Sequence, residues 1–356
     1  MKNIIIQTPK GERKIGPGEP CFIIAEMSGN HNHDFERAKK MIDAAVEAGV
    51  DAVKLQTYTP DTMTINCDKS DFLVGVNDVW KGKTLYELYE WAHTPWEWQK
   101  ELKEYSESKR LLFFSTPFDT SAVDFLEGLG VPLYKVASFE SGDIELLQKI
   151  GSTKKPVIIS RGMTSVEDLE LAINTLKESG APEVAALHCV SSYPATADQM
   201  NLATIEDIRT RFNVVSGLSD HSMDSLGIVV PLMGVALGAS IIEKHFTLRR
   251  ADGGPDAAFS LEPEELKQLV QSVREAEQAI GKPNYITGKK ESENLVFRRS
   301  LYVIKDMKAG DEFTRENVRC IRPGHGLEPK ELPNVLGKTA TKDVERGVRI
   351  SWDLIS

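Results

Sequence analysis

The chain has 356 residues, and its 41% apolar and 27% charged side chains are typical of a folded globular protein and exclude a disordered one. Its 43 basic and 53 acidic residues give a net charge of −10, so no binding to nucleic acid through an overall positive field is expected. The four cysteines form no CxxC pair, which argues against disulfides or structural zinc and favours a reducing cytoplasm.

The first 280 residues alternate short apolar runs with longer amphipathic segments, a pattern typical of parallel strands joined by helices. Helices are expected between the strands, among them residues 35–48, 165–179 and 264–280. The longest apolar run, residues 228–242, is too short to span a membrane, and the first residues lack a signal-peptide core. A soluble cytoplasmic protein is therefore expected. The eight expected strands are residues 21–27, 52–57, 111–117, 133–138, 156–161, 184–190, 214–220 and 240–246.

Eight strand–helix units predict an α/β fold of the (β/α)8 type, a TIM barrel, over residues 1–280. A doubly wound open sheet is the alternative, but no GxGxxG motif follows the first strand. Residues 281–295 are polar and are predicted to be a linker. Residues 296–356 carry short apolar segments punctuated by glycine, which predicts a small C-terminal β-rich domain without a deep pocket of its own.

Polar side chains gather where the predicted strands end, which is where (β/α)8 barrels carry their active groups. Because alternate residues of a strand share a face, Lys54 lies on the same face as Gln56, and Glu243 on the same face as His245. Charged groups inside a barrel need partners, so ligands or metal are expected there. The candidates at the strand ends are Glu26, Lys54, Gln56, Thr116, Phe118, Lys135, Ser138, Glu140, Ser160, Ser191, Tyr193, Ser219, His221, Glu243 and His245.

Two lysines among several hydroxyls predict a receptor for a small anion with carboxylate or phosphate groups, although each lysine alone is compatible with a structural ion pair. His221 and His245 end neighbouring predicted strands, where both imidazoles can reach one ion. The spacing alone leaves structural histidines as the alternative. A surface turn is expected for His31 and His33, and a buried inert thiol for Cys189.

Five short motifs lie at or near the ends of the predicted strands: Lys-Leu-Gln-Thr at 54–57, Ser-Thr-Pro-Phe at 115–118, Ser-Arg-Gly-Met at 160–163, Gly-Leu-Ser-Asp-His at 217–221 and Glu-Lys-His-Phe-Thr at 243–247. Taken together, these motifs resemble the sialic acid synthase (NeuB-like) family over nearly all of the chain. The last domain resembles the SAF (antifreeze-like) domain of that family, with Arg-Arg-Ser-Leu at 298–301 and Arg-Pro-Gly at 322–324.

The resemblance implies a transferase that condenses phosphoenolpyruvate with an amino sugar and releases phosphate by C–O bond cleavage. Residues 253–261 look most like the pseudaminic acid synthases of this family, whose acceptor is a 2,4-diacetamido-2,4,6-trideoxy-altrose. N-acetylneuraminate and legionaminate synthases are the alternatives. Ser191 departs from the Asn that bacterial neuraminate synthases often have. A metal-free sugar-binding protein is the non-enzyme alternative, and a class II aldolase would need a third metal ligand and no lysine pair.

The resemblance also implies roles for single residues. His221 and His245 would hold a divalent ion, Mn, Mg or Co, and Glu26, with Glu140 and Glu243 behind it, would act as general acid or base. An arginine of the SAF domain, here Arg322, would reach the barrel of a partner chain, which predicts a domain-swapped homodimer. The residues implied to hold phosphoenolpyruvate or the sugar are Lys54, Gln56, Thr116, Phe118, Lys135, Ser138, Ser160, Ser191, Tyr193, Ser219, Asp256 and Arg322.

Overall fold

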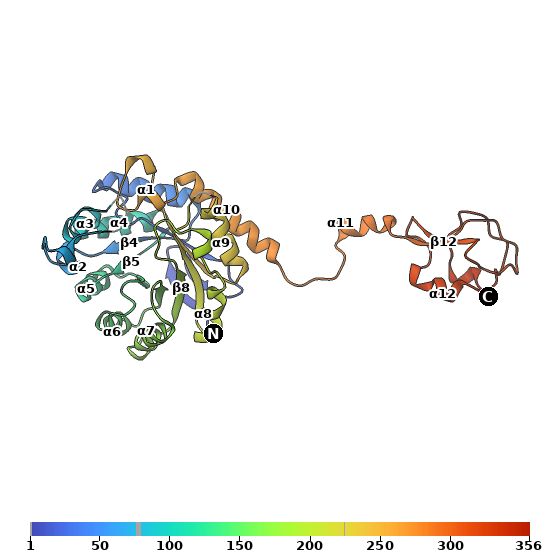
Figure 1. The fold of residues 1–356 in the computed structure, drawn as a ribbon, viewed down its shortest axis with the longest axis horizontal. Coiled ribbons are helices and arrows are strands. Elements are labelled where there is room, and N and C mark those ends of the chain that lie inside the picture. The colour runs from blue at the N-terminus through green and yellow to red at the C-terminus, as the bar shows by residue number, and fades with distance from the viewer. Residues whose placement is uncertain (1, 76–79, 224) are drawn as a thin grey trace. The chain divides into compact units, whose positions relative to one another are not determined.

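The computed structural model describes residues 2–75, 80–223 and 225–356, and the chain divides into two compact units, residues 1–281 and 282–356. Figure 1 shows the first unit as a ring of helices around a set of strands. None of the helices in the described ranges is long and apolar enough to cross a membrane.

Eight parallel strands of the first unit form a closed barrel, so the open-sheet alternative is excluded and the predicted (β/α)8 fold is confirmed. The last strand pairs with both the first and the seventh, which closes the ring. Each strand ends within two residues of its expected bounds. In barrel order the strands are β3 (Phe22–Glu26), β4 (Ala52–Thr57), β5 (Leu112–Pro117), β6 (Tyr134–Val136), β7 (Val157–Arg161), β8 (Val184–Cys189), β9 (Val215–Asp220) and β10 (Ile241–His245).

The helices that cover the barrel begin and end where local chemistry predicts. In α1 (Phe35–Ala48) the Asp34 side chain accepts a hydrogen bond from the backbone N–H of Arg37, and Gly49 ends the helix with φ 82°. The remaining long helices are α3 (Leu85–Ala92), α4 (Trp96–Ser108), α5 (Thr120–Leu129), α6 (Ile144–Ser152), α7 (Val166–Glu178), α8 (Thr204–Phe212), α9 (Leu226–Ala236) and α10 (Pro263–Ile280).

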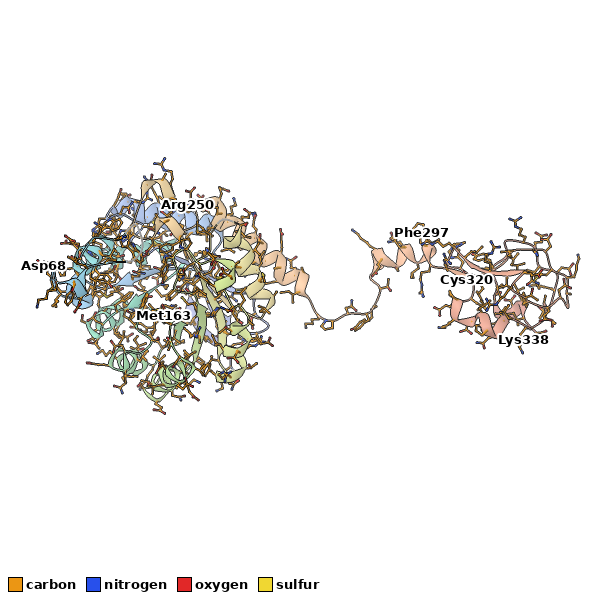
Figure 2. All side chains as sticks on the ribbon, in the orientation of Figure 1. Asp68, Met163, Arg250, Phe297, Cys320 and Lys338 are labelled. Atoms are coloured by element: carbon orange, nitrogen blue, oxygen red, sulfur yellow. The ribbon has the colours of Figure 1, made fainter. Side chains whose placement is uncertain are left out.

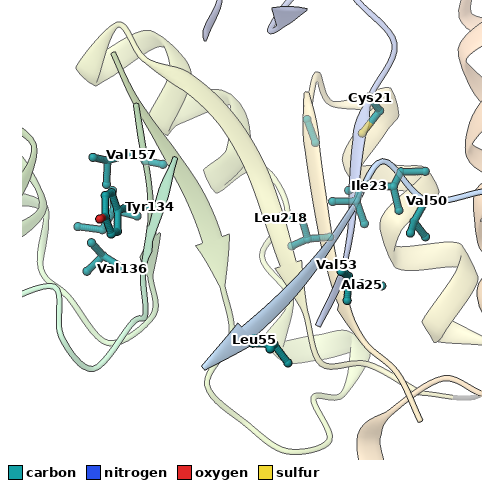
Figure 3. Packing of buried hydrophobic residues seen from close by; sticks show 14 of the residues in the cluster. Cys21, Ile23, Ala25, Val50, Val53, Leu55, Tyr134, Val136, Val157 and Leu218 are labelled. Carbon is teal, nitrogen blue, oxygen red and sulfur yellow. The ribbon is translucent and has the colours of Figure 1, made fainter. Parts of the chain in front are cut away.

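Strand alternation divides the apolar core into two layers. Ile23 and Val53 face outward and pack in the layer beneath the helices, part of which Figure 3 shows. Phe22, Ile24 and Ala52 face the barrel interior, where they belong to a second cluster. Because inward positions recur every second residue, the next ones toward the carboxyl end are Glu26 and Lys54, so the interior changes from apolar to charged at that end.

A hairpin that the sequence analysis did not anticipate precedes the barrel. Strands β1 (Ile4–Thr8) and β2 (Gly11–Ile15) pair antiparallel, and their buried Ile4, Ile6 and Ile15 join the apolar cluster of the barrel interior. The hairpin therefore adds apolar packing to the interior, whereas the charged interior positions lie at the carboxyl ends of the strands.

The second unit is a small β-rich domain with its own core, as expected for a SAF domain. Strands β11 (Ser300–Val303) and β12 (Val318–Ile321) pair antiparallel, and Leu301, Phe313 and Ile350 are buried in its core. The segment expected to be a linker belongs to this unit and contains the short helix α11 (Lys289–Ser292).

Candidate active site

A cavity of about 240 Å³ opens at the carboxyl ends of strands β4 to β10. It brings together most of the residues that the sequence singled out, although they come from positions up to 200 residues apart. Sticks in Figure 2 show how densely side chains fill this part of the barrel. The predicted site residues that line it are Lys54, Gln56, Thr116, Phe118, Lys135, Ser138, Glu140, Ser160, Tyr193, Ser219, His221, Glu243, His245 and Asp256.

Two buried ammonium groups dominate the floor of this cavity. Lys54 contacts the carboxylate of Glu26, lies 3.7 Å from that of Glu243 and donates a 3.2 Å hydrogen bond to Thr116 Oγ1. Lys135 donates to Ser160 Oγ at 2.6 Å, and its nearest described carboxylate, Glu243, is 3.9 Å away. Lys135 is therefore held mainly by neutral oxygens, which leaves its charge available to an anion.

Burial and nearby charges shift the pKa values of these lysines and glutamates in opposite directions. Burial raises the pKa of Glu26 to about 7 despite the nearby Lys54. Burial also tends to raise the pKa of Glu243, but Lys135 and Lys54 outweigh it and hold that pKa below its usual value. Burial lowers the pKa of Lys135, against the attraction of Glu243. This group, the anion cradle (Lys54, Lys135, Glu26, Glu243, Ser138 and Ser160), thus balances two cations with two carboxyl groups, of which Glu243 is the more firmly ionised.

Glu140 is a second carboxyl group in the wall of the cavity. Its Oε2 is buried and has no hydrogen-bond partner, and burial raises its pKa to about 7. A carboxyl group with this pKa exchanges a proton readily near neutral pH, which is what general acid–base catalysis requires.

His221 and His245 lie side by side at the ends of β9 and β10, with ring centroids 5.3 Å apart. His221 Nδ1 is 2.9 Å from the carbonyl oxygen of Val190, whereas Nδ1 of His245 is buried without a hydrogen-bond partner and lies 3.8 Å from the Asp256 carboxylate. Burial, with His221 and Lys54, lowers the pKa of His245, so this imidazole keeps a free lone pair.

The donor set of these two histidines fits a divalent cation with open coordination positions. Within the described ranges no group of three His, Cys, Asp or Glu side chains is arranged to hold a metal ion. A closed structural metal site is therefore not formed there, and any ion at the histidines would take its other ligands from substrate or water.

An aromatic wall also lines the cavity. Tyr58, Trp80 and Tyr89, which the sequence analysis missed, form it with Phe259 of the segment 253–261, and Trp80 Nε1 donates a 2.8 Å hydrogen bond to the carbonyl oxygen of Pro255. The bond ties the segment after β4 to the loop after β10. The density of aromatic residues between positions 80 and 98 was a signal for it in the sequence.

Three predicted site residues do not line the cavity. Glu26 lies beneath it, where Lys54 and the backbone N–H of Ser28 engage its carboxylate. Ser191 is 3.2 Å from Ser138 and lines a neighbouring cavity. Arg322 follows β12 in the second unit and is exposed.

Two structural expectations for individual side chains have different outcomes. His31 and His33 lie in a turn as predicted and His33 is exposed, but His31 is fully buried with its Nε2 2.9 Å from Thr94 Oγ1, so its predicted surface position is wrong. Trp98 packs against its ring, which the sequence pattern did not reveal. Cys189 is buried as expected, but it lines the cavity.

A (β/α)8 barrel that gathers two buried lysines, carboxyl groups and two histidines at the carboxyl ends of its strands belongs to the class of barrel enzymes acting on small anionic substrates. The chain belongs to the NeuB family: the family model matches residues 41–285, and the model of the SAF domain matches residues 298–356.

Curated relatives cover almost the whole chain. It is 44% identical over 326 residues to a pseudaminic acid synthase from Campylobacter jejuni, covering 92% of this chain and 94% of that protein. It is 39% identical to a pseudaminic acid synthase from Helicobacter pylori, over 94% of this chain and 98% of that protein.

A solved structure supports the same relationship. The crystal structure of an N-acetylneuraminic acid synthetase from Leptospira borgpetersenii has a TM-score of 0.70 and 35% sequence identity, and the match covers 80% of this chain and 93% of that one. The family predicted from the motifs is confirmed.

Proposed function

We propose that the protein condenses phosphoenolpyruvate with 2,4-diacetamido-2,4,6-trideoxy-altrose to give pseudaminic acid and inorganic phosphate. The observation that carries the proposal is the pair of buried ammonium groups, Lys54 and Lys135, at the floor of the cavity, in a chain that is 44% identical to a pseudaminic acid synthase. A sugar-binding protein would have no use for such a pair beside two histidines.

In this proposal Lys135, with Ser160 and Ser138, binds the anionic groups of phosphoenolpyruvate. Lys54 adds a second positive charge, and Glu26 beneath it fixes its position. Thr116 and Ser219 complete the polar lining, since each is hydrogen-bonded to a charged member of the group. Because Lys54 and Lys135 are almost fully buried, water screens their charges little from the reacting molecule.

The reaction then forms one carbon–carbon bond and breaks one carbon–oxygen bond. Carbon 3 of phosphoenolpyruvate attacks the open-chain aldehyde, whose oxygen takes up a proton. Water adds to the resulting cation at carbon 2 and loses one proton to a base. Phosphate then leaves with its bridging oxygen and takes up the remaining hydroxyl proton as carbon 2 becomes a ketone. Glu140 is proposed to donate the first proton because its carboxyl group titrates near pH 7, and Glu243 to accept the second because its carboxylate faces the same cavity.

A divalent ion, Mn, Mg or Co, is part of the proposal, with His221 and His245 as its protein ligands. The unpartnered Nδ1 of His245 fits this assignment. Such an ion would supply Lewis-acid polarisation of the acceptor aldehyde.

The choice of acceptor is supported by the aromatic wall. A 6-deoxy sugar presents a methyl group and two acetamido methyl groups, which need apolar surface. Phe259 and Tyr193 pack at 4.9 Å between ring centroids and offer it, and Gln56 and Asp256 provide polar partners beside them. N-acetylneuraminate and legionaminate synthases remain the alternative assignments within the family.

We also propose a cytoplasmic homodimer in which Arg322 of one chain serves the barrel of the other. The Arg-Pro-Gly motif at 322–324 supports this, and Arg322 is exposed after β12, where another chain can reach it. The cytoplasm supplies phosphoenolpyruvate and keeps the four free cysteines reduced.

The experiment that tests the proposed chemistry uses phosphoenolpyruvate labelled with heavy oxygen at the bridging position. We expect phosphate release to require both substrates and the label to leave with phosphate. Label retained in the sugar acid would show P–O cleavage and overturn the mechanism. Condensation with pyruvate in place of phosphoenolpyruvate would instead identify an aldolase.

A further inference from the structure

A second cavity of about 570 Å³ lies next to the anion cradle, at the carboxyl ends of β7 and β8. Cys189 lines both cavities, and Ser138 of the first lies 3.2 Å from Ser191 of the second. Ser138, Cys189, Ser191 and Gly162 form the partition between the two cavities. A Cβ at Gly162 would lie 2.4 Å from Ser191 Oγ, so the backbone approaches as closely as only glycine allows. The partition is thus one layer of small side chains.

The charge of the second cavity is positive. Arg161 follows Ser160 of the cradle directly and is the one charged residue among those that line it in the described part of the chain. Its Nε donates to the carbonyl oxygen of Thr164 at 3.1 Å, and none of the described carboxylates forms an ion pair with its guanidinium. Its terminal nitrogens are therefore available to an anion, which they can bind through two parallel hydrogen bonds.

The other polar groups of this cavity suit an anion that carries a proton. His188 is 2% exposed, and its Nε2 lies 2.6 Å from the carbonyl oxygen of Met200, which assigns the ring proton to Nε2. Its Nδ1 is then an acceptor, and it has no hydrogen-bond partner.

We propose that the second cavity receives the inorganic phosphate that the reaction releases, binding it as hydrogen phosphate between Arg161 and His188. The inference rests on the proposed function, since that reaction generates phosphate next to the partition. Arg161 binds the charge and His188 Nδ1 accepts the hydrogen bond of the phosphate O–H. Met163, labelled in Figure 2, lines this cavity and is 69% exposed. In this proposal phosphate leaves past Met163 while the sugar acid still occupies the first cavity.

The test is equilibrium dialysis of radiolabelled inorganic phosphate with the full-length protein, without acceptor and with saturating phosphoenolpyruvate. We expect phosphate to bind alongside phosphoenolpyruvate. Arg161→Gln should weaken the binding of phosphate about 10- to 100-fold, the effect of losing a charge-assisted hydrogen bond. Arg110→Gln is the matched control, because Arg110 is exposed before the amino end of β5 and the same charge is removed there; it should bind phosphate normally.

Two results would overturn the inference: complete displacement of phosphate by phosphoenolpyruvate, or unchanged phosphate binding in Arg161→Gln. If that variant does not fold, Arg161→Lys replaces it: the charge is kept but the second parallel hydrogen bond is lost, with an expected loss of about three- to tenfold; wild-type binding would again contradict the proposal. If phosphoenolpyruvate itself does not bind, the proposed function fails instead, so the two failures are distinguishable.

Discussion

The Nζ atom of Lys135 on β6 donates a 2.6 Å hydrogen bond to Oγ of Ser160 on the neighbouring strand β7. The contact fixes a fully enclosed ammonium group at the cavity floor with a hydroxyl as its closest partner. Because the nearest carboxylate is 3.9 Å away, an incoming anion does not have to displace a close ion pair. This arrangement distinguishes Lys135 from Lys54, which contacts Glu26 directly.

Replacing Lys135 by methionine keeps the length of the side chain and removes its charge. We expect the affinity for phosphoenolpyruvate to fall about 10- to 100-fold, because a charge-assisted hydrogen bond to the anion is lost. Calorimetric titration of phosphoenolpyruvate measures the change. The control is Lys149→Met, which removes a half-exposed lysine paired with Asp124. Equal affinities in the Lys135 variant and the native protein would refute the proposed role of Lys135 in binding phosphoenolpyruvate.

The pKa of about 7 at Glu140 predicts a pH dependence. If the protonated carboxyl group donates the proton, kcat falls as the pH rises through about 7, and Glu140→Gln loses that descending limb along with about 10²- to 10⁴-fold in kcat. The pH–rate profile of both proteins measures it. Glu170→Gln, at an exposed glutamate of α7, is the control. A descending limb that persists in Glu140→Gln would assign it to another group, such as Glu26.

The same pKa has a consequence for stability. Because the pKa of Glu140 is raised above the usual value of 4.5, its protonated form favours folding, and this contribution is present at low pH and lost as the pH rises through about 7. The free energy of unfolding of Glu140→Gln relative to the native protein should therefore be higher at pH 8 than at pH 5. A difference that does not change with pH would contradict the shifted pKa.

Removal of the divalent ion should abolish turnover, and Mn or Co should restore it. His221→Ala is expected to bind less metal while remaining folded, since the two imidazoles are the proposed protein ligands. Elemental analysis measures the bound metal and circular dichroism reports folding, so neither readout depends on turnover. His325→Ala removes an exposed histidine of the second unit and should keep its metal. A fully active protein without metal would contradict this assignment.

The homodimer proposal makes Arg322 a residue that acts in the partner's barrel. Arg322→Ala should weaken acceptor binding more than phosphoenolpyruvate binding. Mixed with Lys135→Met, it should regain about a quarter of native activity, because half of the dimers are mixed and each holds one complete site. Mixing Lys135→Met with Glu140→Gln is the control, since both changes lie in the barrel and no site is complete. Equal recovery in the two mixtures, or an active monomer, would exclude the swapped arrangement.

The sequence predicted the barrel because each strand is a short apolar run and helices such as α1 and α7 begin with a capping residue, both of which are local signals. It also predicted most of the cavity, since residues that end parallel strands meet at one edge of the barrel. The hairpin of β1 and β2 was missed because five-residue strands with mixed patterning give little periodic signal.

The features that the sequence did not reveal depend on contacts between distant segments. Trp80 reaches the cavity through its bond to Pro255, 175 residues further along the chain. His31 is buried by helix α4, where Trp98 packs against it, so a position that looks like a turn became part of the interior. Glu26 is the last residue of β3 and faces the barrel interior, as expected. The long side chain of Lys54, however, places its ammonium group between Glu26 and the cavity.

The central claim is the identity of the two substrates, and a competition assay tests it most directly. The protein is given phosphoenolpyruvate with equal concentrations of 2,4-diacetamido-2,4,6-trideoxy-altrose, N-acetylmannosamine and the legionaminate precursor, and the products are quantified by mass spectrometry. Product ratios report kcat/KM ratios. We predict that pseudaminic acid exceeds the N-acetylmannosamine product by about 100-fold, the usual limit for a pocket that selects a methyl group over a hydroxyl group. Predominant formation of neuraminate or legionaminate would contradict the assignment and identify the protein as the corresponding synthase.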